Sequence, residues 1–138
     1  MSLLEIDKLS VTFDGEDGPV HAVNDLSLSI SRGETLGIVG ESGSGKSTLG
    51  RALLRLEKSS GEVAFEGRSL QALNARELRP HRREMQIVFQ DPFGSLSPRL
   101  SVRQIVEEGL LVHGIGGGFD GRRKLVEDVL AEVDLEPE

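Results

Sequence analysis

Apolar and polar residues alternate along much of the first 30 residues of the chain. The apolar positions are Leu4, Ile6, Leu9, Val11 and Phe13, and then Leu26, Leu28 and Ile30. Alternation with a period of two predicts strands with one buried face. The intervening residues 14–19 combine Asp, Gly and Pro, which predicts a turn. The pattern therefore predicts an antiparallel β region over residues 1–34.

Two short apolar runs lack this alternation. Residues 35–39 and 85–89 are mostly aliphatic or aromatic, which is typical of strands covered on both faces in a parallel sheet. Helical periodicity begins at Lys46 between the two runs, and Val63 and Phe65 predict another short strand. The apolar face of the helix that follows Lys46 would comprise Leu49, Leu53, Leu54 and Leu56. This alternation of strands and helices predicts an α/β fold.

The second half of the chain is predominantly helical in pattern. Residues 74–77 and 101–104 each have the form of a capping box, in which an N-terminal polar side chain and a Glu or Gln three residues later pair with backbone amides. The last helix begins near Asp120 and would carry an apolar stripe. The stripe consists of Leu125, Val126, Val129, Leu130 and Val133. Residues 114–118, rich in glycine, predict a flexible break before it.

Composition and charge exclude several kinds of protein. The chain has 138 residues, no cysteine and a net charge of −7, with six acids and no base in residues 125–138. The absence of cysteine excludes disulfides, thiolate metal sites and thiol nucleophiles. Without a basic field, we expect no nucleic-acid partner. Every apolar run is far shorter than the roughly 20 residues that span a bilayer, and the acidic N-terminus is unlike a signal peptide, so we expect neither membrane insertion nor export.

A phosphate-binding motif lies between the predicted central strand and its helix. Gly40, Glu41, Ser42, Gly43, Ser44, Gly45, Lys46 and Ser47 match G-x-x-x-x-G-K-[ST]. Glycines allow successive N–H groups to converge on phosphate oxygens, and the helix N-terminus adds partial positive charge. Lys46 is expected to reach the β- and γ-phosphates, Ser47 to bind Mg²⁺ and Thr48 to bond the α-phosphate. The motif therefore predicts a nucleoside triphosphate and Mg²⁺ as ligands, and the resemblance given next implies that the nucleotide is ATP.

With this motif and residues 88–99, Val-Phe-Gln-Asp-Pro-Phe-Gly-Ser-Leu-Ser-Pro-Arg, the chain resembles the ATP-binding subunit of an ABC transporter. It is most similar to peptide importers of the dipeptide, oligopeptide, nickel and microcin types. The resemblance implies that Gln90 lies in the Q-loop and senses Mg²⁺ and the attacking water. Gln90 and Lys46 would then be the catalytic residues. It also implies that Phe13 stacks on adenine, although a Phe on an alternating strand can equally be a core residue.

The resemblance implies a P-loop NTPase core with an antiparallel β edge subdomain. Residues 1–34 would form the β region, residues 35–90 the P-loop core up to the Q-loop, and residues 91–138 the start of a helical subdomain. The parent protein would hydrolyse ATP to power import of peptides or a related solute. It would pair head to tail with a second ATP-binding subunit and bind transmembrane permease subunits as a peripheral protein on the cytoplasmic face of the membrane.

The resemblance extends to the N-terminal portion of such a subunit only. The Walker B aspartate, the signature segment and the switch histidine of the family do not occur in the sequence. We therefore expect the chain to bind nucleotide better than it hydrolyses it, and to self-associate or be poorly soluble because the stripe of its last helix would be exposed.

Two alternatives remain open from the residues alone. Asp91 follows an apolar run, so it could hold the metal of a compact P-loop small-molecule kinase. The chain could also be a non-catalytic interaction fragment that uses its last helix and an arginine cluster, which is otherwise a solvated helix face. The cluster comprises Arg76, Arg79, Arg82 and Arg83.

Overall fold

The computed structural model describes residues 2–136, except for the side chains of residues 92 and 93. These residues form two compact units, Met1–Ile87 and Val88–Glu138, and each unit is described by itself. The subdomain boundaries expected at residues 34 and 90 stay a prediction.

A four-stranded antiparallel sheet forms the frame of the first unit. It consists of β1 (Ser2–Gly15), β2 (Gly18–Ser31), β3 (Ser60–Phe65) and β4 (Arg68–Ser69), in the order β2-β1-β3-β4. The two strands predicted in residues 1–34 are thus confirmed, and they pair with each other through the expected turn. The strand predicted around Val63 and Phe65 is confirmed as β3.

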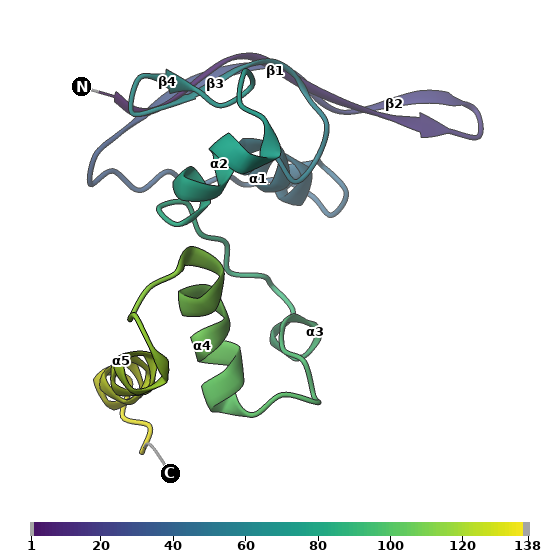
Figure 1. Cartoon of the computed structure of the whole chain (residues 1–138). Coiled ribbons are helices and arrows are strands. Elements are labelled where there is room, and N and C mark those ends of the chain that lie inside the picture. Colours follow the sequence, from purple (N-terminus) through teal and green to yellow (C-terminus); the bar gives the residue numbers. More distant parts are fainter. Residues whose placement is uncertain (1, 137–138) are drawn as a thin grey trace. The chain divides into compact units, whose positions relative to one another are not determined.

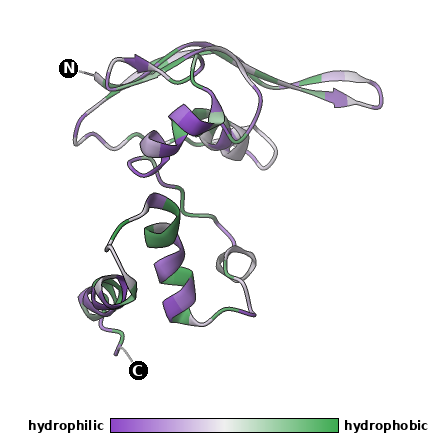
Figure 2. Cartoon of the chain, viewed as in Figure 1, coloured by the Kyte–Doolittle hydropathy of each residue, from purple (hydrophilic) through white to green (hydrophobic). Residues whose placement is uncertain are grey.

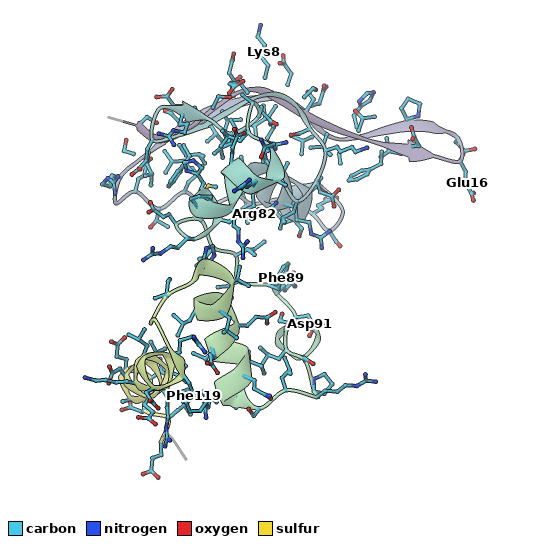
Figure 3. All side chains as sticks on the ribbon, in the orientation of Figure 1. Lys8, Glu16, Arg82, Phe89, Asp91 and Phe119 are labelled. Carbon is cyan, nitrogen blue, oxygen red and sulfur yellow. The ribbon has the colours of Figure 1, made fainter. Side chains whose placement is uncertain are left out.

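One face of the sheet is apolar and packs against helices. Figure 1 shows α1 (Lys46–Leu53) and α2 (Ala75–Arg82) on the same face of the sheet. The buried residues of this core are Ile6, Leu9, Val11, Val23, Leu49, Ala52, Val63, Phe65, Leu70 and Leu78. On the other face, Lys8 points away from the helices in Figure 3. Each fully buried aliphatic side chain contributes about 1.5–3 kcal/mol, so this layer holds the unit together.

The hairpin of β1 and β2 continues beyond the rest of the sheet. β3 pairs with β1 only between Leu4 and Ser10, whereas β2 pairs with β1 as far as Gly15. The outer part of the hairpin is therefore two-stranded, and Glu16 lies at its tip (Figure 3). A register shift after Val11 places one extra residue in β2, which is a β-bulge.

The two strands predicted in residues 35–39 and 85–89 are not formed, so these predictions are wrong for the described structure. Both segments lack regular secondary structure, and the exposed fractions of Val39 and Val88 are 94% and 96%. A strand forms only where a neighbour accepts and donates its backbone hydrogen bonds. None of the described residues pairs with either segment. An apolar run alone does not supply that neighbour.

The second unit is helical. It contains α3 (Pro92–Ser95), α4 (Val102–His113) and α5 (Phe119–Glu132), and Figure 2 shows hydrophobic and hydrophilic residues interspersed along α4. Both predicted capping boxes are confirmed, one at the start of α2 and one at the start of α4. Among the described residues, no helix is both long and apolar enough to cross a membrane.

A partly buried ion pair joins α4 to α5. The carboxylate of Glu107, a buried residue, accepts a hydrogen bond from Arg122 Nε at 2.8 Å. The guanidinium of Arg103 lies 4.5 Å from the centroid of the Phe119 ring. A Cβ at Gly121, in the first turn of α5, would lie closer than 3.0 Å to the carbonyl oxygen of Gly116 in the connection between the helices. The connection is therefore in close contact with α5 at Gly116, and the flexibility of residues 114–118 stays a prediction.

Two predicted surface features are only partly correct. On α5, Val126 and Leu130 are buried, while Val129 and Val133 are 47% and 61% exposed, so two of the five residues of the apolar stripe are exposed in the second unit. In the arginine cluster, Arg82 is half-buried and donates to the Arg55 carbonyl at 3.2 Å. Arg82 therefore does not belong to a solvated face.

Candidate functional site

The predicted phosphate-binding loop turns sharply into α1. The Ser44 amide donates to the Glu41 carbonyl at 3.2 Å, which closes a turn. Gly43 and Gly45 have φ values of 81° and 90°, in the left-handed region that favours glycine. Gly45 is the N-cap of α1, and its carbonyl accepts the first helical hydrogen bond, from Leu49 at 2.8 Å. The sequence prediction that a helix begins at Lys46 is confirmed.

Close packing explains why two positions of the loop require glycine. A Cβ at Gly40 would lie 2.6 Å from Ser44 Oγ, and a Cβ at Gly45 would lie closer than 3.0 Å to the carbonyl oxygen of Ala22 on β2. At Gly43, by contrast, no described atom lies within 4 Å of the corresponding position. The loop thus rests directly on the backbone of β2, at the base of the outer hairpin.

The ammonium group of Lys46 is held across the loop. Its Nζ donates to the carbonyls of Gly40 at 2.7 Å and Glu41 at 2.6 Å, and to Ser44 Oγ at 3.1 Å. An ammonium group has three N–H donors, so each donor has a partner within the loop. A full positive charge is therefore fixed beside the N-terminus of α1, where the helix dipole is also positive.

The N-terminus of α1 has polar groups to offer to an anion. The first N–H groups of a helix have no partner within the helix. Gly45 provides no side-chain cap, and the first turn of this helix contains no acidic residue. The hydroxyl-bearing Ser47 and Thr48 lie in this turn, the former exposed and the latter half-buried. This arrangement of orphan amides, hydroxyls and an ammonium group is suited to binding phosphate.

A pocket of about 290 Å³ lies between the loop and β2. Its walls come from three segments of the first unit, namely β2, the residues that precede the loop, and the loop with α1. They are Ala22, Val23, Asn24 and Leu26, then Ile38 and Val39, and then Gly40, Ser44, Gly45, Lys46 and Leu49. The pocket shows that β2 is part of the surroundings of the loop, which the motif alone does not indicate.

The structure divides the predicted site residues between the two units. Residues 40–48 and Phe13 lie in the first unit, where Phe13 is on β1 with 40% of its surface exposed. Gln90 and Asp91 lie in the second unit. Gln90 is exposed, and the Asp91 carbonyl accepts a hydrogen bond from Ser95 Oγ. Sequence analysis missed Ala22, because its contact with the loop is made by a backbone carbonyl, which leaves no trace in residue type.

Comparisons with known proteins agree with this geometry. The family model described as ABC transporter matches residues 23–137. YejF of Escherichia coli K12, named as an uncharacterized ABC transporter ATP-binding protein, is 48% identical over 99% of this chain. The glutathione import ATP-binding protein GsiA of Salmonella paratyphi A is 51% identical over 86% of it. The chain spans 27% of YejF and 19% of GsiA.

A solved structure extends the comparison to three dimensions. The ATP-binding cassette MJ0796, solved as a dimer bound to ADP and Pi, matches 96% of this chain with a TM-score of 0.80 and 29% identity. The match covers 58% of the MJ0796 chain. The phosphate-binding loop, the sheet that supports it and these similarities agree that the chain belongs to the ABC transporter family, with the α/β fold of its ATP-binding cassettes.

Proposed function

We propose that the chain binds ATP and Mg²⁺ through residues 40–48. The observation that carries the proposal is the position of the Lys46 ammonium group, which is fixed across a tight loop at the uncapped N-terminus of α1. The loop amides would bind phosphate oxygens, Lys46 the β- and γ-phosphates, and Thr48 the α-phosphate. Because the glycines leave no side chain over the backbone, phosphates can approach it closely.

Mg²⁺ and the base would be bound by side chains, whereas the loop amides would bind the phosphates. The Ser47 hydroxyl, in the first turn of α1, is suited to bind Mg²⁺, and the Gln90 amide oxygen would be a second ligand. Mg²⁺ held there would neutralise the negative charge of the phosphates. Phe13 would stack on adenine, which its exposed ring permits.

The larger function is ATP hydrolysis that powers import of a peptide or a related solute. The relative GsiA is named as a glutathione import protein, and glutathione is a tripeptide. The dimeric state of MJ0796 supports pairing with a second ATP-binding subunit, for which we propose a head-to-tail arrangement. Transmembrane permease subunits would be further partners, with the chain at the cytoplasmic face of the membrane.

By itself the chain should bind ATP better than it hydrolyses it. Hydrolysis also needs a carboxylate that holds Mg²⁺ and a group that orients water, beyond the phosphate-binding loop. The family match includes the segment that contains Asp91, and it favours a transport ATPase over a small-molecule kinase.

The proposal is tested by replacing Lys46 with Ala and titrating the purified chain with a fluorescent ATP analogue. Hydrogen bonds to charged groups contribute about 1.5–3 kcal/mol, so we expect roughly a 10- to 150-fold loss of affinity. Lys58→Ala is the matched control, because Lys58 is an exposed lysine of the same unit that lies outside the loop. Unchanged affinity in Lys46→Ala, with the circular dichroism spectrum retained, would contradict the proposal.

A further inference from the structure

The arginines of α2 form a stripe on the exposed side of this helix. Arg76, Arg79 and Arg83 follow one another at spacings of three and four residues, which places them on one face. Arg83 is the C-cap and keeps helical backbone angles. All three residues are exposed, whereas Leu78 of the same helix is buried in the core. This arginine stripe therefore faces away from the sheet that α2 covers.

Two members of the stripe, Arg76 and Arg83, carry a charge that no ion pair neutralises within the described part of the chain. The adjacent Glu77 is engaged in the capping box, where its carboxylate accepts a hydrogen bond from the Asn74 amide at 2.9 Å. Glu84, which follows Arg83 in the sequence, makes no ion pair with a described residue either. Because the whole chain has a net charge of −7, the stripe is a local positive surface on an acidic molecule. Such a surface attracts an anionic partner.

Helix α5 of the second unit carries the complementary charge. Asp128 and Glu132 are exposed and four residues apart, so they lie on one face. Neither of them makes an ion pair with a described residue, in contrast to Glu127, which pairs with Arg123 Nε at 2.7 Å. The last turn of α5 contains no basic residue. The C-terminal half of this helix therefore presents an acidic row whose charge is not neutralised by its neighbours.

An exposed apolar row runs beside these carboxylates. Val129 and Val133 each follow one of the two acids directly in the sequence, and both valines are exposed. Arginine packs its aliphatic stem on apolar surface while its guanidinium group stays with polar groups. An acidic row beside an apolar row is therefore a surface that an arginine stripe fits. At a rise of about 1.5 Å per residue, the two carboxylates are about 6 Å apart along the helix axis, which is also the spacing of the last two arginines of the stripe.

We propose that the arginine stripe of one copy of the chain binds the acidic and apolar rows of α5 in a second copy. The segment that contains these rows, residues 125–138, holds six acids and no base, which gives it a charge opposite to that of the stripe. The carboxylates accept charge-assisted hydrogen bonds from the guanidinium groups, and the valines lie against the arginine stems. The contact involves no residue of the phosphate-binding loop, so it forms without nucleotide and is independent of the proposed function.

The test is sedimentation equilibrium of the full chain without nucleotide, with two charge-reversed variants measured alone and as a mixture. One variant combines Arg76→Glu with Arg83→Glu, and the other combines Asp128→Arg with Glu132→Arg. All four positions are exposed, so both variants should fold, which circular dichroism verifies. In either variant alone the two surfaces have the same sign, so we expect self-association to weaken about tenfold. In an equimolar mixture each surface meets one of opposite sign, so association should return to that of the unmodified chain.

The matched control combines Lys8→Glu with Lys58→Glu, two exposed lysines of the first unit outside α2, and changes the net charge by the same amount as the arginine variant. It should weaken self-association far less. In about 1 M salt, where the Debye length is about 3 Å, self-association of the unmodified chain should also weaken. The inference is overturned by a monomeric unmodified chain, by association that salt does not weaken, by undiminished association of either variant alone, by a mixture that stays monomeric, or by equal weakening in the control.

Discussion

Replacement of Gly45 by Ala tests the contact between the phosphate-binding loop and β2. A Cβ at this position would lie closer than 3.0 Å to the Ala22 carbonyl oxygen, and the residue has φ of 90°. Gly43, two residues earlier, has a similar φ of 81° but no described atom within 4 Å of its Cβ position. The variants Gly45→Ala and Gly43→Ala therefore share the backbone penalty and differ in the steric one.

The structure gives a magnitude for each penalty. A non-glycine residue in the left-handed region costs about 1–2 kcal/mol, which applies to both variants. In Gly45→Ala the loop must also move from β2 by about 1 Å to restore van der Waals contact, and overpacking of this kind costs about 1–3 kcal/mol. We therefore expect Gly45→Ala to lower the free energy of unfolding by about 2–5 kcal/mol, against about 1–2 kcal/mol for Gly43→Ala.

Urea unfolding followed by far-ultraviolet circular dichroism is the appropriate assay. The chain has no Trp and no Tyr, so intrinsic fluorescence offers little signal. The free energies of unfolding of the two variants are compared with that of the unmodified chain. Equal destabilisation by both substitutions would show that Ala22 and Gly45 are not in close contact, and the argument that β2 supports the loop would be refuted.

Two further predictions concern the second unit. Glu107→Gln should lower its free energy of unfolding by about 1.5–3 kcal/mol, because the Arg122 guanidinium loses the charged partner of a partly buried hydrogen bond. Glu108→Gln serves as control, because Glu108 is the exposed neighbour of Glu107. Equal unfolding midpoints for the two variants would contradict the stabilising role of the ion pair between Glu107 and Arg122. Light scattering at high concentration should show self-association of the chain, reduced by Val133→Lys on the exposed stripe of α5. A monodisperse monomer would contradict this prediction.

Local patterns predicted the elements whose stability is local. The alternation in β1 and β2 predicted a hairpin, and both capping boxes are present at the predicted helix starts. The loop motif predicted the start of α1 at Lys46, because glycine conformation and helix capping depend on neighbouring residues. These features need no distant partner, and a single sequence therefore contains enough information to find them.

The errors concern segments whose structure depends on distant partners. Residues 35–39 and 85–89 have the composition of buried strands, yet they are unpaired, since a strand needs a hydrogen-bonded neighbour that composition does not specify. The close contact of Gly116 with Arg122 of α5 is likewise made only in the folded chain.

The sequence by itself determined the phosphate-binding loop, the helix that follows it and the strands of the hairpin, because each depends on residues close together along the chain. Only the tertiary structure decided that the Ala22 carbonyl supports Gly45 and that the Lys46 ammonium group bonds across the loop. These are decided by backbone groups, which all residue types possess, so the pattern of side chains cannot encode them.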